Sequence, residues 1–94
     1  MNIDETDIHH HLKLRMLQRG ISKEEIENTL SKGWFANDAK KGVKGKVFIF
    51  PYNNYWEGKY YEEKEVTVYY KVKGDKINFL TVKARYGKTF IKGG

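Results

Sequence analysis

Apolar residues recur at helical spacing in the first third of the chain. Ile8, Leu12 and Met16 follow one another every fourth residue, which predicts an amphipathic helix over about residues 7–19. Gly20, directly after it, can adopt the left-handed conformation that ends a helix. The first predicted element is therefore a helix with a defined end.

A second helix is predicted to begin directly after this glycine. Ser22 and Glu25 have the spacing of a capping box, and Ile21 with Ile26 has that of a hydrophobic staple. Both motifs mark a helix start, and Gly33 marks the end of the helix near residue 32. The sequence thus predicts a helical hairpin.

After this hairpin the pattern changes to the alternation of polar and apolar residues that is typical of strands. The predicted segments are a short strand at 34–35, a turn over 39–45, a strand over 46–50 ended by Pro51, an aromatic loop over 52–59, and strands over 65–73 and 76–86 joined at Gly74-Asp75.

The order of these elements predicts an α+β domain with both helices packed on one face of a small antiparallel sheet of three to four strands. Ninety-four residues suffice for one domain, divided here into a loose leader over 1–5, the helical hairpin over 7–33 and the sheet over 34–88. The chain has no cysteine, no run of 18 apolar residues and no signal peptide, which favours a protein of the cytoplasm that contacts no membrane.

The last two strands are each predicted to have one apolar and one polar face. The apolar face should carry Val66, Val68, Tyr70 and Val72 from one strand and Leu80, Val82, Ala84 and Tyr86 from the other. The polar face should carry Thr67, Tyr69, Lys71, Thr81, Lys83 and Arg85, with no acid among them.

Such a face matches a phosphodiester ligand, because ammonium and guanidinium groups bind phosphate oxygens and a tyrosine ring can stack on a base. The formal charge of the chain is +6, and residues 52–65 carry −2 of it, so the other 80 residues carry +8. A polyanion is the partner that this distribution favours, although a solvated lysine-rich surface is an equally good explanation of charge alone. The acidic stretch over residues 62–65 would repel a polyanion such as RNA, so it should lie away from the active surface.

A line of His11, Arg15 and Arg19 recurs every fourth residue beside the apolar stripe of the first helix. Arginine stems that lie along the apolar border, with a packed histidine, are the ordinary explanation. The alternative is chemical: metal-independent RNA cleavage needs proton carriers, for which histidine is suited, and cations at the phosphate, for which Arg15, Lys83 and Arg85 are suited. Adjacent histidines point about 100° apart on a helix, so we expect neither a metal site nor a cofactor.

The same residues carry a resemblance. The pattern H-x-x-x-R-M-x-x-R-G-I-S, followed by E-E-I and a later glycine, and the segment from Leu80 to Lys88 resemble a bacterial domain-of-unknown-function family of small toxin-like proteins. By similarity that family is related to RelE-like and BrnT-like toxins and to the barnase, EndoU, colicin and RelE group of metal-independent ribonucleases, the BECR type of fold.

The resemblance implies an endoribonuclease toxin that cleaves cellular RNA by attack of a 2′-hydroxyl and is neutralised by a cognate antitoxin or immunity protein. It would act in the cytoplasm, or in the cytoplasm of a target cell if the chain is the tip of a secreted toxin. The candidate catalytic residues are His11, Arg15, Thr81, Arg85 and Tyr86, and the candidate RNA-binding residues are Arg19, Tyr69, Lys71, Lys83 and Lys88.

Three questions stay open on the sequence alone. Either His11 lies at the rim of the sheet and joins the polar face, or the site lies between the first helix and the sheet edge, where Tyr70 or Tyr86 would be its partner. The alternative function is a nucleic-acid-binding or protein-interaction module without catalysis. The aromatic segment 50–61 either caps the core, which we favour, or forms a lip for bases or a partner.

Overall fold

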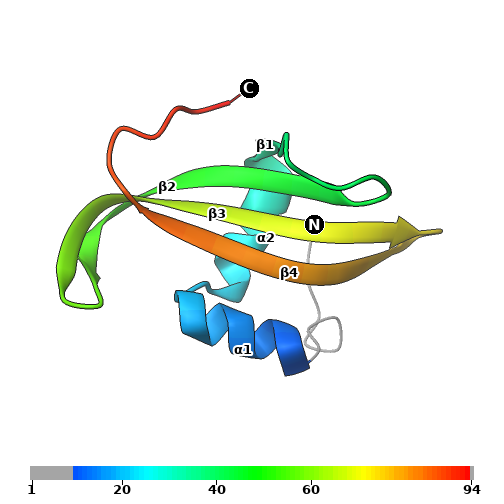
Figure 1. The fold of residues 1–94 in the computed structure, drawn as a ribbon, viewed down its shortest axis with the longest axis horizontal. Coiled ribbons are helices and arrows are strands. Elements are labelled where there is room, and N and C mark those ends of the chain that lie inside the picture. The colour runs from blue at the N-terminus through cyan, green and yellow to red at the C-terminus, as the bar shows by residue number, and fades with distance from the viewer. Residues whose placement is uncertain (1–9, 94) are drawn as a thin grey trace.

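The structure, a computed structural model, describes residues 10–93 and has the expected α+β layout of two helices followed by an antiparallel sheet (Figure 1). The elements are α1 (His10–Arg19), α2 (Lys23–Lys32), β1 (Trp34–Phe35), β2 (Lys44–Trp56), β3 (Lys59–Lys73) and β4 (Lys76–Gly87). The four strands pair with their neighbours in chain order, β1-β2-β3-β4. The predicted leader and the first residues of the first helix lie outside the described residues.

Local signals fixed the junction between the helices as the sequence predicts. Gly20 has a φ of +67°, and the amide of Ile21 donates to the carbonyl of Met16 at 2.8 Å, which closes α1. The capping box is complete, because the Ser22 hydroxyl accepts from the Glu25 amide and the Glu25 carboxylate accepts from the Ser22 amide. Helix α2 therefore begins where the motif predicts.

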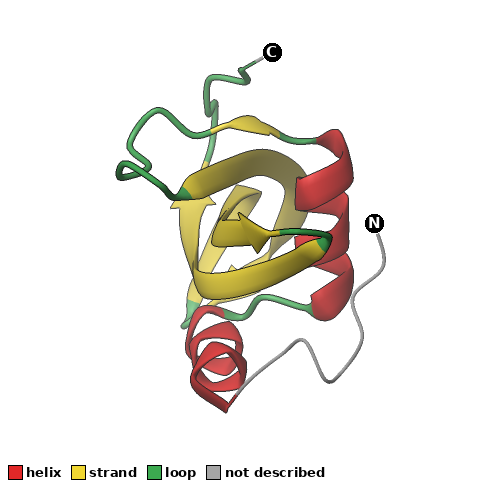
Figure 2. Cartoon of the chain, turned by 90° about the vertical axis from the view of Figure 1, so that its right-hand side faces the viewer, coloured by secondary structure: helices red, strands yellow, loops and turns green. Residues whose placement is uncertain are grey.

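Both helices lie on one side of a strongly curled sheet (Figure 2). Helix α1 runs along β4, and α2 packs across β2 and β3. The core between them and the sheet is made of Leu12, Ile21, Ile26, Leu30, Val66, Val68, Tyr70, Phe79 and Val82. Burial of these apolar side chains holds the helices against what we call the core face of the sheet.

Two expectations about strand length were wrong. The residue Pro51 does not end its strand, because β2 continues to Trp56 past an irregularity between Pro51 and Asn54. Proline is tolerated at such a break in the ladder. The predicted aromatic loop over residues 52–59 is therefore the end of a long β2–β3 hairpin, which turns at Glu57 and Gly58.

The predicted alternation in β4 was also wrong before Thr81. A bulge makes Leu80 the extra residue between the pairs Tyr69–Thr81 and Tyr70–Phe79. Phe79, 3% exposed, therefore takes the core position, and Leu80 is 39% exposed. Val72, near the hairpin end, is likewise exposed and not in the core.

Candidate functional site

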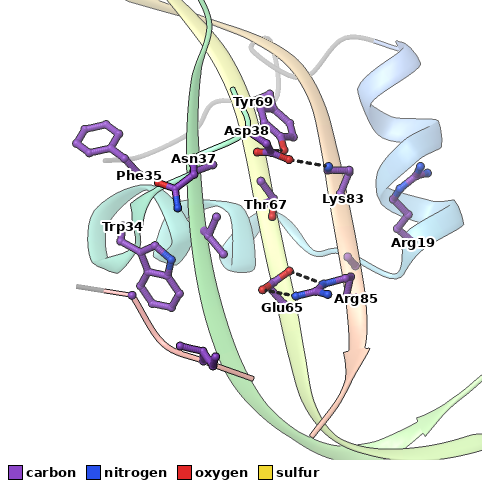
Figure 3. A pocket seen from close by; sticks show the side chains of 15 residues that line it. Arg19, Trp34, Phe35, Asn37, Asp38, Glu65, Thr67, Tyr69, Lys83 and Arg85 are labelled. Carbon is purple, nitrogen blue, oxygen red and sulfur yellow. Dashed lines mark hydrogen bonds and ion pairs between the residues drawn. The ribbon is translucent and has the colours of Figure 1, made fainter. Parts of the chain in front are cut away.

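A cleft of about 900 Å³ lies on the sheet face opposite the core face (Figure 3). Its floor includes Val47 and Thr67, which are paired across β2 and β3. The segment after β1 forms one wall, the side chains of β4 and the end of α1 the other, and the C-terminal tail crosses one end. The lining residues whose side chains can form hydrogen bonds or carry charge are Arg19, Trp34, Asn37, Asp38, Glu65, Thr67, Tyr69, Lys83 and Arg85.

A carboxylate and a guanidinium face each other across β3 and β4 in this cleft. Glu65 and Arg85 are register partners, and the Arg85 Nε and Nη2 donate to Glu65 Oε1 and Oε2 at 2.8 and 3.0 Å. This hydrogen-bonded pairing raises the pKa of Arg85, so its positive charge is secured. The expectation of a polar face without acid was therefore wrong, as was the expectation that residues 62–65 lie away from it, because Glu65 lines the cleft.

A second group of polar side chains lies further along the same face. The Tyr69 hydroxyl donates to Asp38 Oδ1 at 2.8 Å, and the Lys83 Nζ lies 3.5 Å from Asp38 Oδ2. The Tyr69 hydrogen bond lowers the pKa of Asp38, whereas burial raises the pKa of Tyr69. Tyr69 and, less strongly, Asp38 raise the pKa of Lys83. At neutral pH this group thus holds one carboxylate, one ammonium and one neutral phenol.

The face of the Tyr69 ring is occupied by protein. Lys83 Nζ lies over the ring, 5.0 Å from its centroid, and a Cβ built on Gly45 would come within 3.1 Å of the ring carbons. Lys83 and Gly45 thus both crowd the Tyr69 ring, and its hydroxyl is engaged with Asp38.

The helical line of α1 reaches the cleft only at its last residue. Arg19 also lines the cleft, and it lies on the side of β4 opposite to the one toward which Lys83 and Arg85 point (Figure 3). His11 and Arg15 are exposed and are not among the lining residues, while Leu12 between them is buried in the core. The line and the strand face therefore share one cleft through Arg19, and His11 is not placed to act on a group bound there.

The other candidates lie elsewhere. Tyr86 is on the core face, where its hydroxyl donates to the Arg19 carbonyl at 2.6 Å and burial raises its pKa. Thr81 pairs with Tyr69 but does not line the cleft. Lys71 is exposed near the β3–β4 turn, and Lys88 is exposed after the end of β4. None of these four side chains joins Arg19, Lys83 and Arg85.

A buried lysine ties the helix junction to the core face of the sheet. Lys64 is 2% exposed, and its ammonium donates to the Gly20 carbonyl and, at 2.8 Å, to Glu25 Oε1. The rings of Tyr52 and Tyr86 flank it, with centroids 5.5 and 5.6 Å from Nζ. Lys64 thus joins the Gly20 carbonyl and the Glu25 carboxylate of the helix junction to β3.

Three rings of the aromatic segment pack on Tyr86 of β4. Trp56 stacks on Tyr86 with ring centroids 5.0 Å apart, and Tyr52 and Tyr61 contact the same ring. Tyr55 and Tyr60 form an exposed pair at the end of the hairpin. No residue of the 50–61 segment lines the cleft, and the half-buried Phe50 packs against the core, which agrees for this ring with the capping role that we favoured.

Sequence reasoning missed Glu65, Asp38 and Trp34 as site residues. A signal existed for Glu65, because strict alternation with Thr67 and Tyr69 places it on the polar face, one pair beyond Lys83. Asp38 joins the site because the segment after β1 reaches Tyr69 of β3 and Lys83 of β4, and Trp34 joins it because β1 pairs with β2. No local sequence pattern encodes either approach.

The comparisons place this chain in a family. Residues 8–84 match the model of a family described as a domain of unknown function, DUF4258, and the chain belongs to that family. No curated protein and no solved structure matches the chain. The matched span contains Glu65 and Lys83 and ends before Arg85 and the C-terminal tail. No helix within residues 10–93 has the length and apolar character needed to cross a membrane.

Proposed function

We propose that the protein binds single-stranded RNA in this cleft and cleaves it without a metal ion. The observation that carries the proposal is the meeting of three cations, Arg19, Lys83 and Arg85, with the Glu65 carboxylate in one cleft formed by α1, β3 and β4. Guanidinium and ammonium groups bind phosphate oxygens, and a neighbouring carboxylate is a proton acceptor.

The spacing of the cations suits a nucleic-acid strand. Lys83 and Arg85 point to the same face two residues apart, a rise of about 7 Å along a strand, close to the separation of successive phosphates in a single strand. Arg85 uses Nε and Nη2 for Glu65, which leaves further N–H donors for a phosphate. Arg19 of α1 lines the same cleft from the far side of β4, while Lys83 and Arg85 point toward β3, so a strand bound there meets positive charge along the floor and at the rim.

The Glu65–Arg85 pair supplies the first half of the chemistry. The Glu65 carboxylate takes the proton of a 2′-hydroxyl as that oxygen bonds to the neighbouring phosphorus, and Arg85 and Arg19 stabilise the added negative charge. The bond from phosphorus to the 5′ oxygen then breaks. That oxygen takes a proton from the Lys83 ammonium, which is a far stronger acid than the alcohol formed. The products are a 2′,3′-cyclic phosphate and a 5′-hydroxyl, and solvent restores both side chains.

This assignment changes the expected catalytic set. Glu65 replaces His11 as proton acceptor because Glu65 lines the cleft and His11 does not. Arg15, Thr81 and Tyr86 have no part in it, and Lys71 and Lys88 remain peripheral cations.

A second candidate function is RNA binding without cleavage. It is favoured by the fact that both strand cations already have carboxylate partners, Arg85 with Glu65 and Lys83 with Asp38. Such ion pairs hold the side chains of a binding surface in place, but they leave neither a carboxylate nor an ammonium group unpaired for proton transfer. Formation of cyclic phosphate ends separates the two candidates.

The RelE-like toxin class and a cognate antitoxin or immunity protein belong to the same proposal. An inhibitor of an RNA cleft with this charge would present acidic side chains to Arg19, Lys83 and Arg85. Arrest of growth on induced expression, relieved when Glu65→Gln replaces the wild type, supports the toxin class. Normal growth with ample folded protein would count against it.

The binding experiment measures affinity for a 2′-O-methyl RNA oligonucleotide, which cannot be cleaved by this chemistry, over a range of salt concentrations. Three phosphate contacts give a slope of log K against log salt of about −2, since each contact on a single strand contributes about −0.7. Lys83→Gln should reduce the magnitude of the slope by about 0.7. The control is Lys71→Gln, which changes the same charge outside the cleft and should leave the slope close to that of the wild type. Equal effects of the two variants, or no affinity at all, would contradict the proposed site.

A further inference from the structure

The C-terminal tail, residues 88–93, lies across the end of the cleft that holds Glu65 and Arg85. The Phe90 amide donates to Glu63 Oε1 at 2.9 Å, and Lys92 Nζ lies 3.9 Å from Glu63 Oε2. Ile91 and Gly93 then line the cleft as the chain passes towards β1 (Figure 3). The tail is thus held on one side by β3 and reaches the opposite wall.

The tail contacts two flat groups. The Arg85 guanidinium carbon lies over the Phe90 ring, 4.9 Å from its centroid, in a cation–π contact that leaves the Arg85 side chain 67% exposed. At the other wall, a Cβ built on Gly93 would come within 2.6 Å of the Trp34 indole, which means that the tail backbone lies directly on that ring. A guanidinium plane and an indole are the surfaces on which nucleobases stack in single-strand binding sites.

We infer that the Arg85 plane and the Trp34 indole form a nucleobase subsite of the cleft, and that the tail occupies this subsite until RNA displaces it. This inference rests on the proposed RNA binding. Phe90 takes the place of one base on Arg85, and the backbone near Gly93 takes the place of another on Trp34. The phosphates lie deeper, at Lys83 and at the remaining N–H groups of Arg85.

Few buried contacts hold the tail in the cleft, so RNA can displace it. Ile91 is 93% exposed, so the apolar side chain between the two contacted groups contributes no burial. Lys92 is exposed as well, and its ion pair with Glu63 is long. Segments held by few buried contacts open with little free energy, and residues 88–93 belong to no helix or strand that such opening would disturb.

The test is equilibrium binding of a 2′-O-methyl RNA oligonucleotide to the wild type, to Phe90→Ala and to Ile91→Ala. Phe90→Ala should tighten binding about two- to fivefold, the fold-change that corresponds to losing one exposed cation–π contact. Ile91→Ala is the matched control, because it shortens an exposed side chain of the same segment, and it should bind as the wild type does. A second variant that ends at Lys88 should also bind more tightly than the wild type.

An oligonucleotide of the same length without bases distinguishes the subsite from simple blocking of the backbone. Phe90→Ala should give no gain with it, because a strand without bases does not use the stacking surfaces. An equal gain with and without bases would overturn the assignment of a nucleobase subsite. Wild-type binding that no tail variant changes would overturn the tail inference alone. Absence of binding by the wild type and every variant would overturn the proposed function with it.

Discussion

Replacement of the buried lysine by an apolar residue of similar length, Lys64→Met, should strongly destabilise the fold. The Lys64 ammonium is the link between the α1–α2 junction and β3, because it donates both to the Gly20 carbonyl and to the Glu25 carboxylate. Methionine keeps most of the packing of the stem between Tyr52 and Tyr86 and removes only the charged donor.

The magnitude follows from what is left behind. A buried carbonyl that loses its partner costs about 1–3 kcal/mol, and loss of one member of a buried ion pair costs about 3–5 kcal/mol. Glu25 retains the hydrogen bond from the Ser22 amide, and its side chain is 21% exposed, both of which reduce the cost. Removal of the ammonium also recovers its own desolvation. We therefore expect a loss of about 3 kcal/mol in the free energy of unfolding.

Urea unfolding followed by tryptophan fluorescence measures this loss, because Trp56 belongs to the ring cluster around Tyr86. Lys71→Met is the control, since it makes the same exchange at an exposed position of the same strand and should change stability by about 0.5 kcal/mol or less. Glu25→Gln keeps an oxygen for the capping box, and together with Lys64→Met it should give a coupling energy of at least about 1 kcal/mol. A loss below about 1 kcal/mol for Lys64→Met, or no coupling, would refute this account of the junction.

Two further substitutions test the same region. Gly20→Ala should cost about 2–4 kcal/mol in the same unfolding assay, because the residue has a φ of +67° and its new Cβ would lie 2.5 Å from Trp56 Cζ3 and 2.9 Å from the Tyr86 hydroxyl; a neutral effect would contradict the close packing. Tyr86→Phe should cost about 1–2 kcal/mol at neutral pH through loss of the bond to the Arg19 carbonyl. Since burial raises the pKa of Tyr86 above its ordinary value of 10, its stabilisation is complete below about pH 10 and is lost as the pH rises further. The difference between wild type and Tyr86→Phe should therefore shrink above pH 10, and a difference that grows there would contradict the assigned burial.

The helical half of the fold was predictable because its signals are local. A left-handed glycine at Gly20 and the reciprocal bonds of Ser22 and Glu25 each depend on residues within one turn, so their spacing in the sequence suffices. The class of the fold followed from the order of the elements. Alternation then placed Val66 and Val68 on the core face correctly.

The sheet was less predictable, because one extra residue in a strand moves the side chains on one side of it to the opposite face of the sheet. The bulge at Leu80 exchanges it with Phe79, and nothing in the local sequence marks the position. Burial of Lys64 continues the alternation that buries Val66, but the predicted strand began only at residue 65, and lysine is a residue type that is rarely buried. Its partners, Gly20 and Glu25, are 44 and 39 residues away along the chain.

The candidate site was predicted in part. Lys83, Arg85 and Tyr69 were expected on one face, and Arg19 joins them in one cleft, which the sequence had left open. His11 failed to reach the cleft because α1 lies along β4 with Leu12 as its inward residue, and only the end of the helix meets the cleft edge. The acids that balance the cations, Glu65 and Asp38, depend on strand register and on the loop after β1.

The most direct test of RNA cleavage in this cleft is the product formed from single-stranded RNA in the presence of a metal chelator. The wild type should release fragments that end in 2′,3′-cyclic phosphate, and Glu65→Gln should lose this activity while still binding 2′-O-methyl RNA. Glu62→Gln, an exposed neighbour on the same strand, should cleave as the wild type does. Intact RNA after incubation with folded wild-type protein, or full activity in Glu65→Gln, would contradict the proposed cleavage.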